Sequence, residues 1–158
     1  MPTERACQVI RTLDVIGEKW SLLIVRNALR GQTRYSQFRE SLGAPTDILT
    51  NRLGKLVDAG VLEKRAYREE GDRERSSYHL TAKGEALRVV IAAMVQWSDE
   101  FDSAPQGPSL RLIDGGGQAV SLGYVDASGA VIGRDEVLMA SGPGASTVWG
   151  PIGVSAGA

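Results

Sequence analysis

The side chains that most often carry catalytic or metal chemistry are scarce in this sequence. Its 158 residues include one histidine, His79, and one cysteine, Cys7. A transition-metal site needs several thiolate or imidazole ligands, and a histidine-based triad needs a nucleophile, a base and an orienting group. We therefore expect no enzymatic activity, no metal and no cofactor. A single cysteine also excludes an internal disulfide, which suits a cytosolic protein.

Chemistry of a different kind is indicated by the segment 44–60, APTDILTNRLGKLVDAG. Apolar residues recur along one side of it at helical spacing, namely Ile48, Leu49, Leu53, Leu56 and Val57. The other side carries short polar groups and then two cations: Thr46, Asp47, Thr50, Asn51, Arg52 and Lys55. A merely solvated face usually carries longer Glu and Lys side chains, so this composition favours a binding role.

These polar groups match the hydrogen-bonding edges of nucleobases. Asn51 can bond adenine through two hydrogen bonds, and Thr46 or Thr50 can bond either a base or a phosphate. Asp47 has two interpretations, because its carboxylate could accept from cytosine N4 or could simply favour the positive end of a helix. Arg52 and Lys55 lie further along the helix and are better placed for phosphates.

The charge distribution supports a polyanionic partner for this part of the chain only. The formal net charge of the whole chain is -1, yet residues 26–55 contain six basic residues and two acids. Electrostatic attraction depends on which face carries the charge rather than on the total. Arg34 and Ser36 begin a predicted helix, where a cation and backbone amides suit a phosphate, although a simple helix cap is the alternative.

Hydrophobic periodicity and capping signals predict five helices and a β-hairpin in the first two thirds of the chain. The helices are expected at 6–16, 18–30, 35–42, 46–59 and from 81 to about 101, and the strands at 61–68 and 76–80. Thr46 and Thr81 are predicted N-caps, and Gly60 is expected to end its helix. Three short helices followed by a hairpin predict an α+β winged helix-turn-helix, whose last helix before the hairpin enters the DNA major groove.

The turn of the predicted hairpin, EEGDRERS, is strongly charged. Arg68, Arg73 and Arg75 stand in or beside it among four acids, Glu69, Glu70, Asp72 and Glu74. Because carboxylates repel phosphates, we expect one or two of the three arginines to contact DNA.

Several motifs resemble the HxlR family of transcription regulators, a branch of the MarR-like winged helices. They are GEKWSLLIVRNALRGQTRYSQF, LTNRLGKLVDAGVLEKRAY and RSSYHLTAKG, followed by Trp97 on the last helix, and the resemblance covers about residues 5–101. It implies a homodimer that is joined through the first and last helices and binds a near-palindromic operator in double-stranded DNA. Two features depart from the family: the wing lacks a common proline pair, and Pro45 stands where a polar helix-starting residue is usual.

The resemblance also implies a regulatory signal. Several members respond to quinones, aldehydes or oxidants through a cysteine near the N-terminus, and Cys7 matches that position. A dimeric repressor that is released through Cys7 is therefore one hypothesis. A non-covalent small-molecule effector with a structural Cys7 is the second, and its pocket would be lined by Trp20, Tyr35 and Trp97. A winged helix that binds protein instead of DNA is the third, which the basic stretch 26–55 disfavours.

The composition changes near Pro105, after which twelve of the nineteen glycines occur. We predict a winged helix-turn-helix domain with dimerisation helices at 1–103 and a Gly-rich β-hairpin extension at 104–158. Its short strands should turn at GGG, DASG and GRDE, and its end from residue 146 is expected to be disordered. Some relatives carry a similar-looking zinc ribbon, but this extension has no cysteine, so we predict a metal-free remnant. No apolar run approaches the roughly 18 residues of a membrane span.

Overall fold

The computed structural model describes residues 7–68, 74–145 and 152, in two compact units. One unit, called the core unit below, holds Thr12–Ile91. The other, called the tail unit, holds Met1–Arg11 and Ala92–Ala158. Among the described residues, no helix is both long and apolar enough to cross a membrane.

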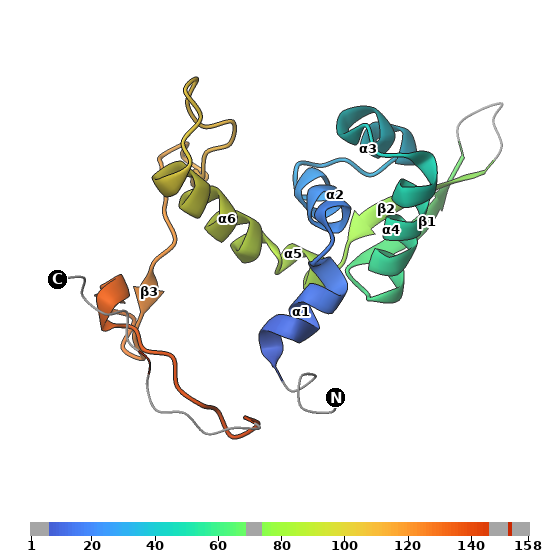
Figure 1. Cartoon of the computed structure of the whole chain (residues 1–158). Coiled ribbons are helices and arrows are strands. Elements are labelled where there is room, and N and C mark those ends of the chain that lie inside the picture. Colours follow the sequence, from blue (N-terminus) through green and yellow to red (C-terminus); the bar gives the residue numbers. More distant parts are fainter. Residues whose placement is uncertain (1–6, 69–73, 146–151, 153–158) are drawn as a thin grey trace. The chain divides into compact units, whose positions relative to one another are not determined.

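The core unit is a winged helix, so the predicted fold class is confirmed (Figure 1). Its elements are the end of α1 (Gln8–Ile16), α2 (Lys19–Leu29), α3 (Tyr35–Leu42), α4 (Thr46–Asp58), β1 (Leu62–Tyr67), β2 (Arg75–Leu80), α5 (Ala82–Glu85) and the start of α6 (Arg88–Phe101). The bounds of α3 agree with the prediction at both ends, and those of α2 and α4 differ by one residue.

Side chains from α2, α3, α4 and the hairpin form one hydrophobic core. Ile24 and Val25 of α2 and Phe38 of α3 have no exposed surface. Apolar residues are too numerous in α2 for a single side, as is typical of a buried central helix, and α2 contacts α3, α4 and β2. Helix α2 is therefore the element on which the other parts of the core unit pack.

The hairpin is extended by the segment just before α3. Strands β1 and β2 pair antiparallel from Leu62↔Leu80 to Tyr67↔Arg75. On the other side of β2, Arg34 forms a bridge with Ser77, and the Tyr78 amide donates to the Thr33 carbonyl at 2.7 Å. This isolated bridge was not predicted, and it brings the first turn of α3 beside the hairpin.

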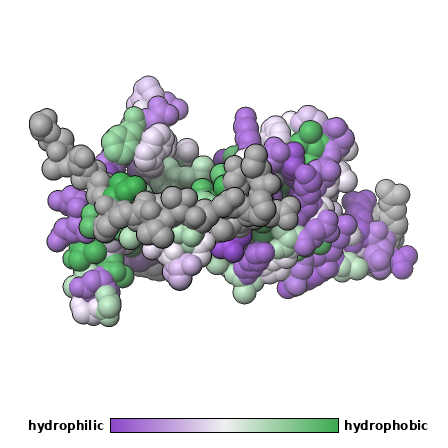
Figure 2. Space-filling model, turned by 60° about the horizontal axis from the view of Figure 1, so that its bottom comes forward, coloured by the Kyte–Doolittle hydropathy of each residue, from purple (hydrophilic) through white to green (hydrophobic). Residues whose placement is uncertain are grey.

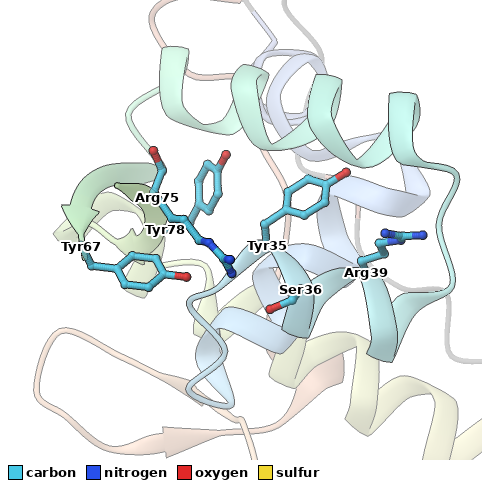
Figure 3. A pocket seen from close by; sticks show the side chains of 7 residues that line it. Tyr35, Ser36, Arg39, Tyr67, Arg75 and Tyr78 are labelled. Atoms are coloured by element: carbon cyan, nitrogen blue, oxygen red, sulfur yellow. The ribbon is translucent and has the colours of Figure 1, made fainter. Parts of the chain in front are cut away.

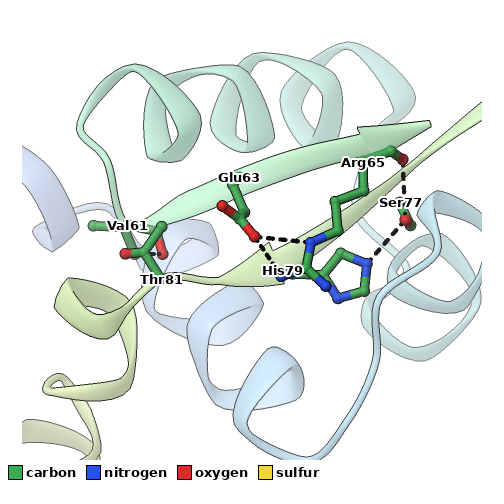
Figure 4. A network of polar contacts seen from close by, with 6 residues as sticks. All are labelled: Val61, Glu63, Arg65, Ser77, His79 and Thr81. Atoms are coloured by element: carbon green, nitrogen blue, oxygen red, sulfur yellow. Dashed lines mark hydrogen bonds and ion pairs between the residues drawn. The ribbon is translucent and has the colours of Figure 1, made fainter.

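A polar network crosses the hairpin (Figure 4). The buried hydroxyl of Ser77 donates to the Arg65 carbonyl at 3.1 Å and lies 2.9 Å from His79 Nε2, to which it is hydrogen-bonded. The Arg65 Nε donates to the Glu63 carboxylate at 2.8 Å. The only histidine therefore makes a structural contact between neighbouring residues of β2.

Two helix starts test the predicted caps. The Thr81 hydroxyl accepts from the Gly84 amide at 3.1 Å, so Thr81 is the N-cap of α5 as predicted. The predicted cap at Thr46 is wrong, because extended Pro45 occupies that position and its carbonyl accepts the first helical bond from Leu49. Thr46 is therefore the first residue inside α4, with Asp47 in the first turn as predicted.

The single long helix predicted after the hairpin is in fact two helices. Helix α5 ends at Glu85, and α6 begins at Arg88 after a turn at Ala86 and Leu87. The Leu87 amide bonds the Gly84 carbonyl at 3.1 Å, three residues back, which tightens the chain and ends the regular α-helical ladder. Sequence periodicity missed this break because the apolar positions continue through it.

The tail unit contains α6 from Ala92 onward and a small ribbon (residues 110–137) fixed to it. The ribbon includes an Ile113–Ala119 bridge, the two-stranded pair of β3 (Tyr124–Val125) and β4 (Val131–Ile132), and the 3-10 helix η2 (Arg134–Glu136). The turns predicted at GGG and DASG are present, whereas GRDE forms η2. In the described ranges, no three His, Cys, Asp or Glu side chains gather as a metal site would require.

Two polar contacts hold the ribbon on α6. The Gln96 side chain accepts from the Leu122 amide at 2.8 Å and donates to its carbonyl at 3.1 Å. Arg134 forms a two-bond ion pair with Glu100, and this hydrogen bonding lowers the pKa of the Glu100 carboxyl. Hydrophobic residues nevertheless reach the surface of this unit, as the green atoms in Figure 2 show, with Trp97 62% and Val131 80% exposed.

Two helical glycines differ in the space around them. A methyl group on Gly84 would lie 2.2 Å from the Val61 carbonyl oxygen, whereas Gly54 has open space on its Cα. We expect Gly84→Ala to destabilise the protein by about 1–3 kcal/mol through overpacking. We expect Gly54→Ala to stabilise it by about 0.5–1 kcal/mol, because alanine loses less backbone entropy in a helix. Urea unfolding of both variants measures this, and equal shifts in the same direction would contradict it.

Candidate nucleic-acid interface

Helix α4 has one buried and one exposed side. Leu49, Leu53 and Leu56 are fully buried, and α4 packs on α2 and on β1. The exposed residues of α4 are Thr46, Asp47, Thr50, Asn51, Lys55 and Asp58, the last residue of the helix, and the first five are called the polar face of α4 below. The predicted division of this helix into an apolar and a polar side is thus observed.

Some side chains of the polar face are hydrogen-bonded within the protein, and others are not. The Thr50 hydroxyl donates to the Thr46 carbonyl at 2.8 Å and lies 3.2 Å from the Tyr35 hydroxyl, which also donates to the Thr46 carbonyl at 3.2 Å. Tyr35 thereby joins the start of α3 to the first turn of α4. Within the described part of the chain, the Asn51 amide makes no side-chain hydrogen bond, so both its donor and its acceptor are available to a partner.

Arg52 does not lie on the polar face. Its side chain is 15% exposed and forms an ion pair with Glu18 at 3.1 Å. Its Nε is buried and has no partner among the described residues. Glu18 is the N-cap residue of α2, so this pair connects α4 to the α1–α2 junction. The expectation that Arg52 reaches a phosphate does not fit this position, which sequence spacing alone could not show.

A pocket of about 490 Å³ lies between α3 and the hairpin. We call it the α3–hairpin pocket, and Figure 3 shows its lining side chains. They are Tyr35, Ser36, Arg39, Tyr67, Arg75, Ser76 and Tyr78. At its edge the Arg34 guanidinium lies 4.9 Å from the centre of the Tyr67 ring. Burial, and then the neighbouring Tyr35, raise the pKa of Tyr78, which keeps its phenol protonated.

The pocket gathers some predicted residues and adds others. Ser36, Arg75 and Tyr35 were candidates from the sequence, whereas Arg39 and Tyr67 were not. Arg39 follows Tyr35 by one helical turn, a spacing that would have placed it on the same side of α3. Tyr67 could not be found this way, because only the pairing of the Thr33–Arg34 segment with β2 brings β1 and α3 together.

The remaining candidate residues lie elsewhere. Trp20 packs partly buried against the core, with the Lys19 ammonium 5.4 Å from its ring. Trp97 is exposed in the tail unit, and its ring centre lies 5.8 Å from that of Phe101. Of the three aromatic residues expected around an effector, Tyr35 alone is in the lining of the α3–hairpin pocket. Arg68 is exposed, and Arg73 lies outside the described residues.

Cys7 lies directly before α1. It is exposed, and its carbonyl accepts the first helical hydrogen bond from the Arg11 amide at 3.1 Å. The thiol is thus accessible to a reagent, and it stands at the end of a helix whose Val9 and Leu13 side chains are 65% and 55% exposed.

This geometry agrees with comparison to known proteins. The family model described as HxlR-like helix-turn-helix matches residues 15–106, more than half of the chain. The chain belongs to this family. The resemblance in the sequence motifs predicted this family, and curated relatives of the chain are named as HTH-type transcriptional regulators.

Relatives from two bacterial genera match about three fifths of this HxlR-like chain. The uncharacterized HTH-type transcriptional regulator Rv3095 of Mycobacterium tuberculosis is 39% identical over 102 residues, which are 65% of this chain and 63% of Rv3095. The matched region thus spans less than two thirds of that relative. The regulator sll1512 of Synechocystis is 34% identical over 93 residues, 58% of this chain and 67% of its own.

Solved structures show the same fold. PA1607, provisionally assigned as a transcription factor, is 38% identical with a TM-score of 0.71, covering 83% of this chain and 92% of its own. The redox regulator HypR in its oxidized form is 27% identical with a TM-score of 0.55, covering 62% and 100%. The regulator YodB of Bacillus subtilis, in its reduced form, is 26% identical with a TM-score of 0.52, covering 61% and 94%.

The Glu18–Arg52 pair should contribute to stability as a coupled unit. In a double-mutant cycle of Glu18→Gln and Arg52→Gln, followed by urea unfolding, we expect a coupling energy of about 0.5–1 kcal/mol, since Glu18 is largely exposed and solvent screens the pair. The matched cycle of Glu18→Gln with Lys55→Gln should show none, because Lys55 lies exposed on the polar face of α4. Additive effects in both cycles would refute the role assigned to Arg52.

Proposed function

We propose that this regulator binds double-stranded DNA with the polar face of α4 in the major groove, and that it acts as a repressor. The observation that supports the proposal is that α4 has one buried apolar side and one exposed polar side. Three leucines fix its inner side against the core, and short polar side chains cover its outer side. A major groove admits an α-helix and displays hydrogen-bonding groups that such side chains can contact.

Base contacts are assigned to the first half of the polar face. Asn51 has an uncommitted amide, which suits a bidentate bond to adenine. Thr46 and Asp47 lie in the first turn, where recognition helices commonly touch base edges. Thr50 is bonded to Tyr35 and to the Thr46 carbonyl, so it supplies a fixed hydroxyl that can still accept.

Contacts with the DNA phosphates are assigned to the basic residues around the polar face and to one serine. Lys55 lies further along α4, Arg34 and Ser36 begin α3, and the wing supplies Arg68, Arg73 and Arg75. Arg39 joins this set because it lines the α3–hairpin pocket beside Ser36. Arg52 is assigned a positioning role instead, because its side chain is only 15% exposed and its guanidinium is paired with Glu18.

We infer a homodimer from exposed apolar residues on α1 and α6. Val9, Leu13, Met94, Trp97 and Phe101 are all at least half exposed. Helices with apolar side chains on an exposed side commonly bury them against another helix. A two-fold dimer would place two copies of α4 on a near-palindromic operator, with half-sites about one helical turn of DNA apart.

The signal is proposed to act through Cys7. Its exposure supports this, as does the similarity to HypR and YodB, the first of which is a redox regulator. Oxidation or alkylation of a thiol at the start of α1 would alter the proposed dimer helices. A non-covalent effector with a structural Cys7 is the alternative.

Base and backbone roles can be separated by mutation. Asn51→Ala should weaken binding to the operator by about 1–3 kcal/mol and leave binding to random DNA nearly unchanged, because only a base contact is lost. Lys55→Ala should weaken both equally and lower the slope of log K against log salt by about one, because it removes one phosphate contact. Footprinting and titration on DNA upstream of the gene measure these effects.

Two outcomes of the same experiment would overturn the proposal. Equal losses of operator and random-DNA affinity in both variants would contradict the assigned roles. No binding of any DNA at low salt would instead favour a winged helix that binds protein. A footprint confined to one half-site would contradict the dimer.

The role of Cys7 is tested by Cys7→Ser, which replaces the thiol with a hydroxyl of similar size. Treatment with benzoquinone should release DNA from the wild-type protein and leave the variant bound, since the hydroxyl is a far weaker nucleophile. Gel shifts before and after treatment measure the effect. Release from both proteins would exclude thiol sensing at Cys7.

A further inference from the structure

Three oxygen atoms lie close together where α3 meets the first turns of α4. The Thr50 hydroxyl donates to the Thr46 carbonyl at 2.8 Å, and the Tyr35 hydroxyl lies 3.2 Å from the same carbonyl. The two hydroxyl oxygens are themselves 3.2 Å apart. Tyr35 is the first residue of α3, and its hydroxyl is directed toward α4 (Figure 3). Thr50 is exposed on the polar face of α4 and yet has two acceptors inside the protein.

The number of hydrogens in this cluster determines what Thr50 offers to a partner. Tyr35 and Thr50 each supply one hydroxyl hydrogen. Two hydrogen bonds among the three oxygens form only when both hydrogens point inward, whichever of the hydroxyls donates to the Thr46 carbonyl. Turning the Thr50 hydrogen outward leaves one internal bond instead of two. The cluster therefore holds Thr50 with its oxygen lone pairs, and not its hydrogen, toward the outside.

Asp47 places a second acceptor beside Thr50. The two residues are three positions apart on α4, so their side chains are neighbours on its surface. A carboxylate accepts hydrogen bonds and donates none. In the part of the chain that the structure describes, the Asp47 carboxylate has no hydrogen-bond or ion-pair partner. This part of the polar face thus presents acceptors alone, whereas Asn51 beside it presents both a donor and an acceptor.

The bases differ in the group that meets such an acceptor in the major groove. Adenine carries an amino donor where guanine carries its O6 acceptor, and cytosine carries an amino donor where thymine carries O4. An oxygen without an available hydrogen bonds the amino group and is repelled by the carbonyl oxygen. An acceptor-only side chain therefore distinguishes adenine from guanine, or cytosine from thymine, at one place in the groove.

We propose that Thr50 is a specificity-determining residue that accepts from the exocyclic amino group of an adenine or a cytosine, with Asp47 selecting a second amino group beside it. The internal bonds with Thr46 and Tyr35 restrict Thr50 to this role, because an unrestrained threonine hydroxyl bonds donors and acceptors alike. The inference rests on the proposed DNA binding, since it states which base edges the polar face of α4 selects.

The first experiment compares the full-length wild-type protein with Thr50→Val, which replaces the hydroxyl with a methyl group of similar size. Both are titrated with the footprinted operator and with each of its single base-pair substitutions. The wild type should bind the operator about tenfold more tightly than the A→G or C→T substitution at one base pair of each half-site. Thr50→Val should lose this preference and keep the others. Thr50→Ser, which retains a hydroxyl, should keep all of them, and circular dichroism checks that each variant is folded.

The second experiment isolates the amino group. At the base pair identified with Thr50→Val, adenine is replaced by purine, or cytosine by 2-pyrimidinone, and each of these analogues lacks only the amino group. The wild type should lose about tenfold in affinity, and Thr50→Val should lose none, because the cycle removes the two partners of one hydrogen bond. A change in the duplex itself would affect both proteins equally.

Asp47 is tested in the same series by Asp47→Asn, whose amide has the same shape but also donates. This variant should tolerate guanine or thymine at one further base pair of each half-site. Unchanged preferences would refute the part of the proposal that concerns Asp47 and leave it a role at the start of α4 only.

Three results would overturn the assignment of Thr50. The wild type could prefer guanine or thymine at the base pair whose preference Thr50→Val loses. Thr50→Val could lose affinity equally for operator and random DNA, which is the behaviour of a phosphate contact. The amino deletion and Thr50→Val could have additive effects. Failure of the function proposed above looks different, because the wild-type protein then shows no sequence preference at any base pair, and this inference fails with it.

Discussion

The burial of the inner side of α4 against α2 is the contact on which the proposed interface depends. Leu49, Leu53 and Leu56 of α4, and Ile24 and Val25 of α2, have no exposed surface. Each buried aliphatic side chain contributes about 1.5–3 kcal/mol relative to exposure, so a rotation of α4 would be costly. Because helical side chains repeat every 3.6 residues, fixing the leucines also fixes the direction of Asn51 and Lys55. The polar face is thus oriented by the core, and the Glu18–Arg52 pair adds a polar restraint at the same helix.

The parts of the fold that the sequence predicted correctly are those set by local signals. Helix α3 was predicted at its observed bounds because Gly43, with a φ of 62°, ends it with a left-handed residue. The Thr81 cap was predicted because threonine hydroxyls accept from the first turn of a helix. Thr46 has the same side chain, but Pro45, with a φ of -54° and an extended ψ, already occupies the cap position. A threonine near a helix start thus indicates a possible N-cap, but the conformation of the preceding residue decides whether it occupies the cap position.

Contacts between distant segments account for what the sequence did not predict. The spacing within α4 placed Arg52 beside Lys55 in the candidate set, yet a partner from the start of α2 draws its side chain inward. The α3–hairpin pocket arises because the segment before α3 pairs with β2, and no periodicity in either segment indicates that pairing. Residues such as Arg39 and Tyr67 acquire a shared site only through this tertiary contact. The exposed residues of α4 could be predicted, since their orientation follows from one helix and its buried side.

The ribbon of the tail unit packs on α6 without covering the exposed aromatic residues that we assign to the proposed dimer. HypR is matched over its whole length by 62% of this chain. The match with PA1607 covers 83%, which must include part of the chain beyond residue 106, because the residues up to that point make up about two thirds of it. Gln96 and Glu100, four residues apart, hold the ribbon along one side of α6.

Trp97 and Phe101 follow those two residues by one position each, which turns them about 100° around the helix. Both side chains remain about 60% exposed with the ribbon in place. The ribbon therefore lies on a different side of α6 from these two aromatic side chains and leaves them exposed. Because Glu100 is bonded to Arg134 on the ribbon side, its charge is compensated within the tail unit. The aromatic side that would face a second copy of the chain is thus left apolar.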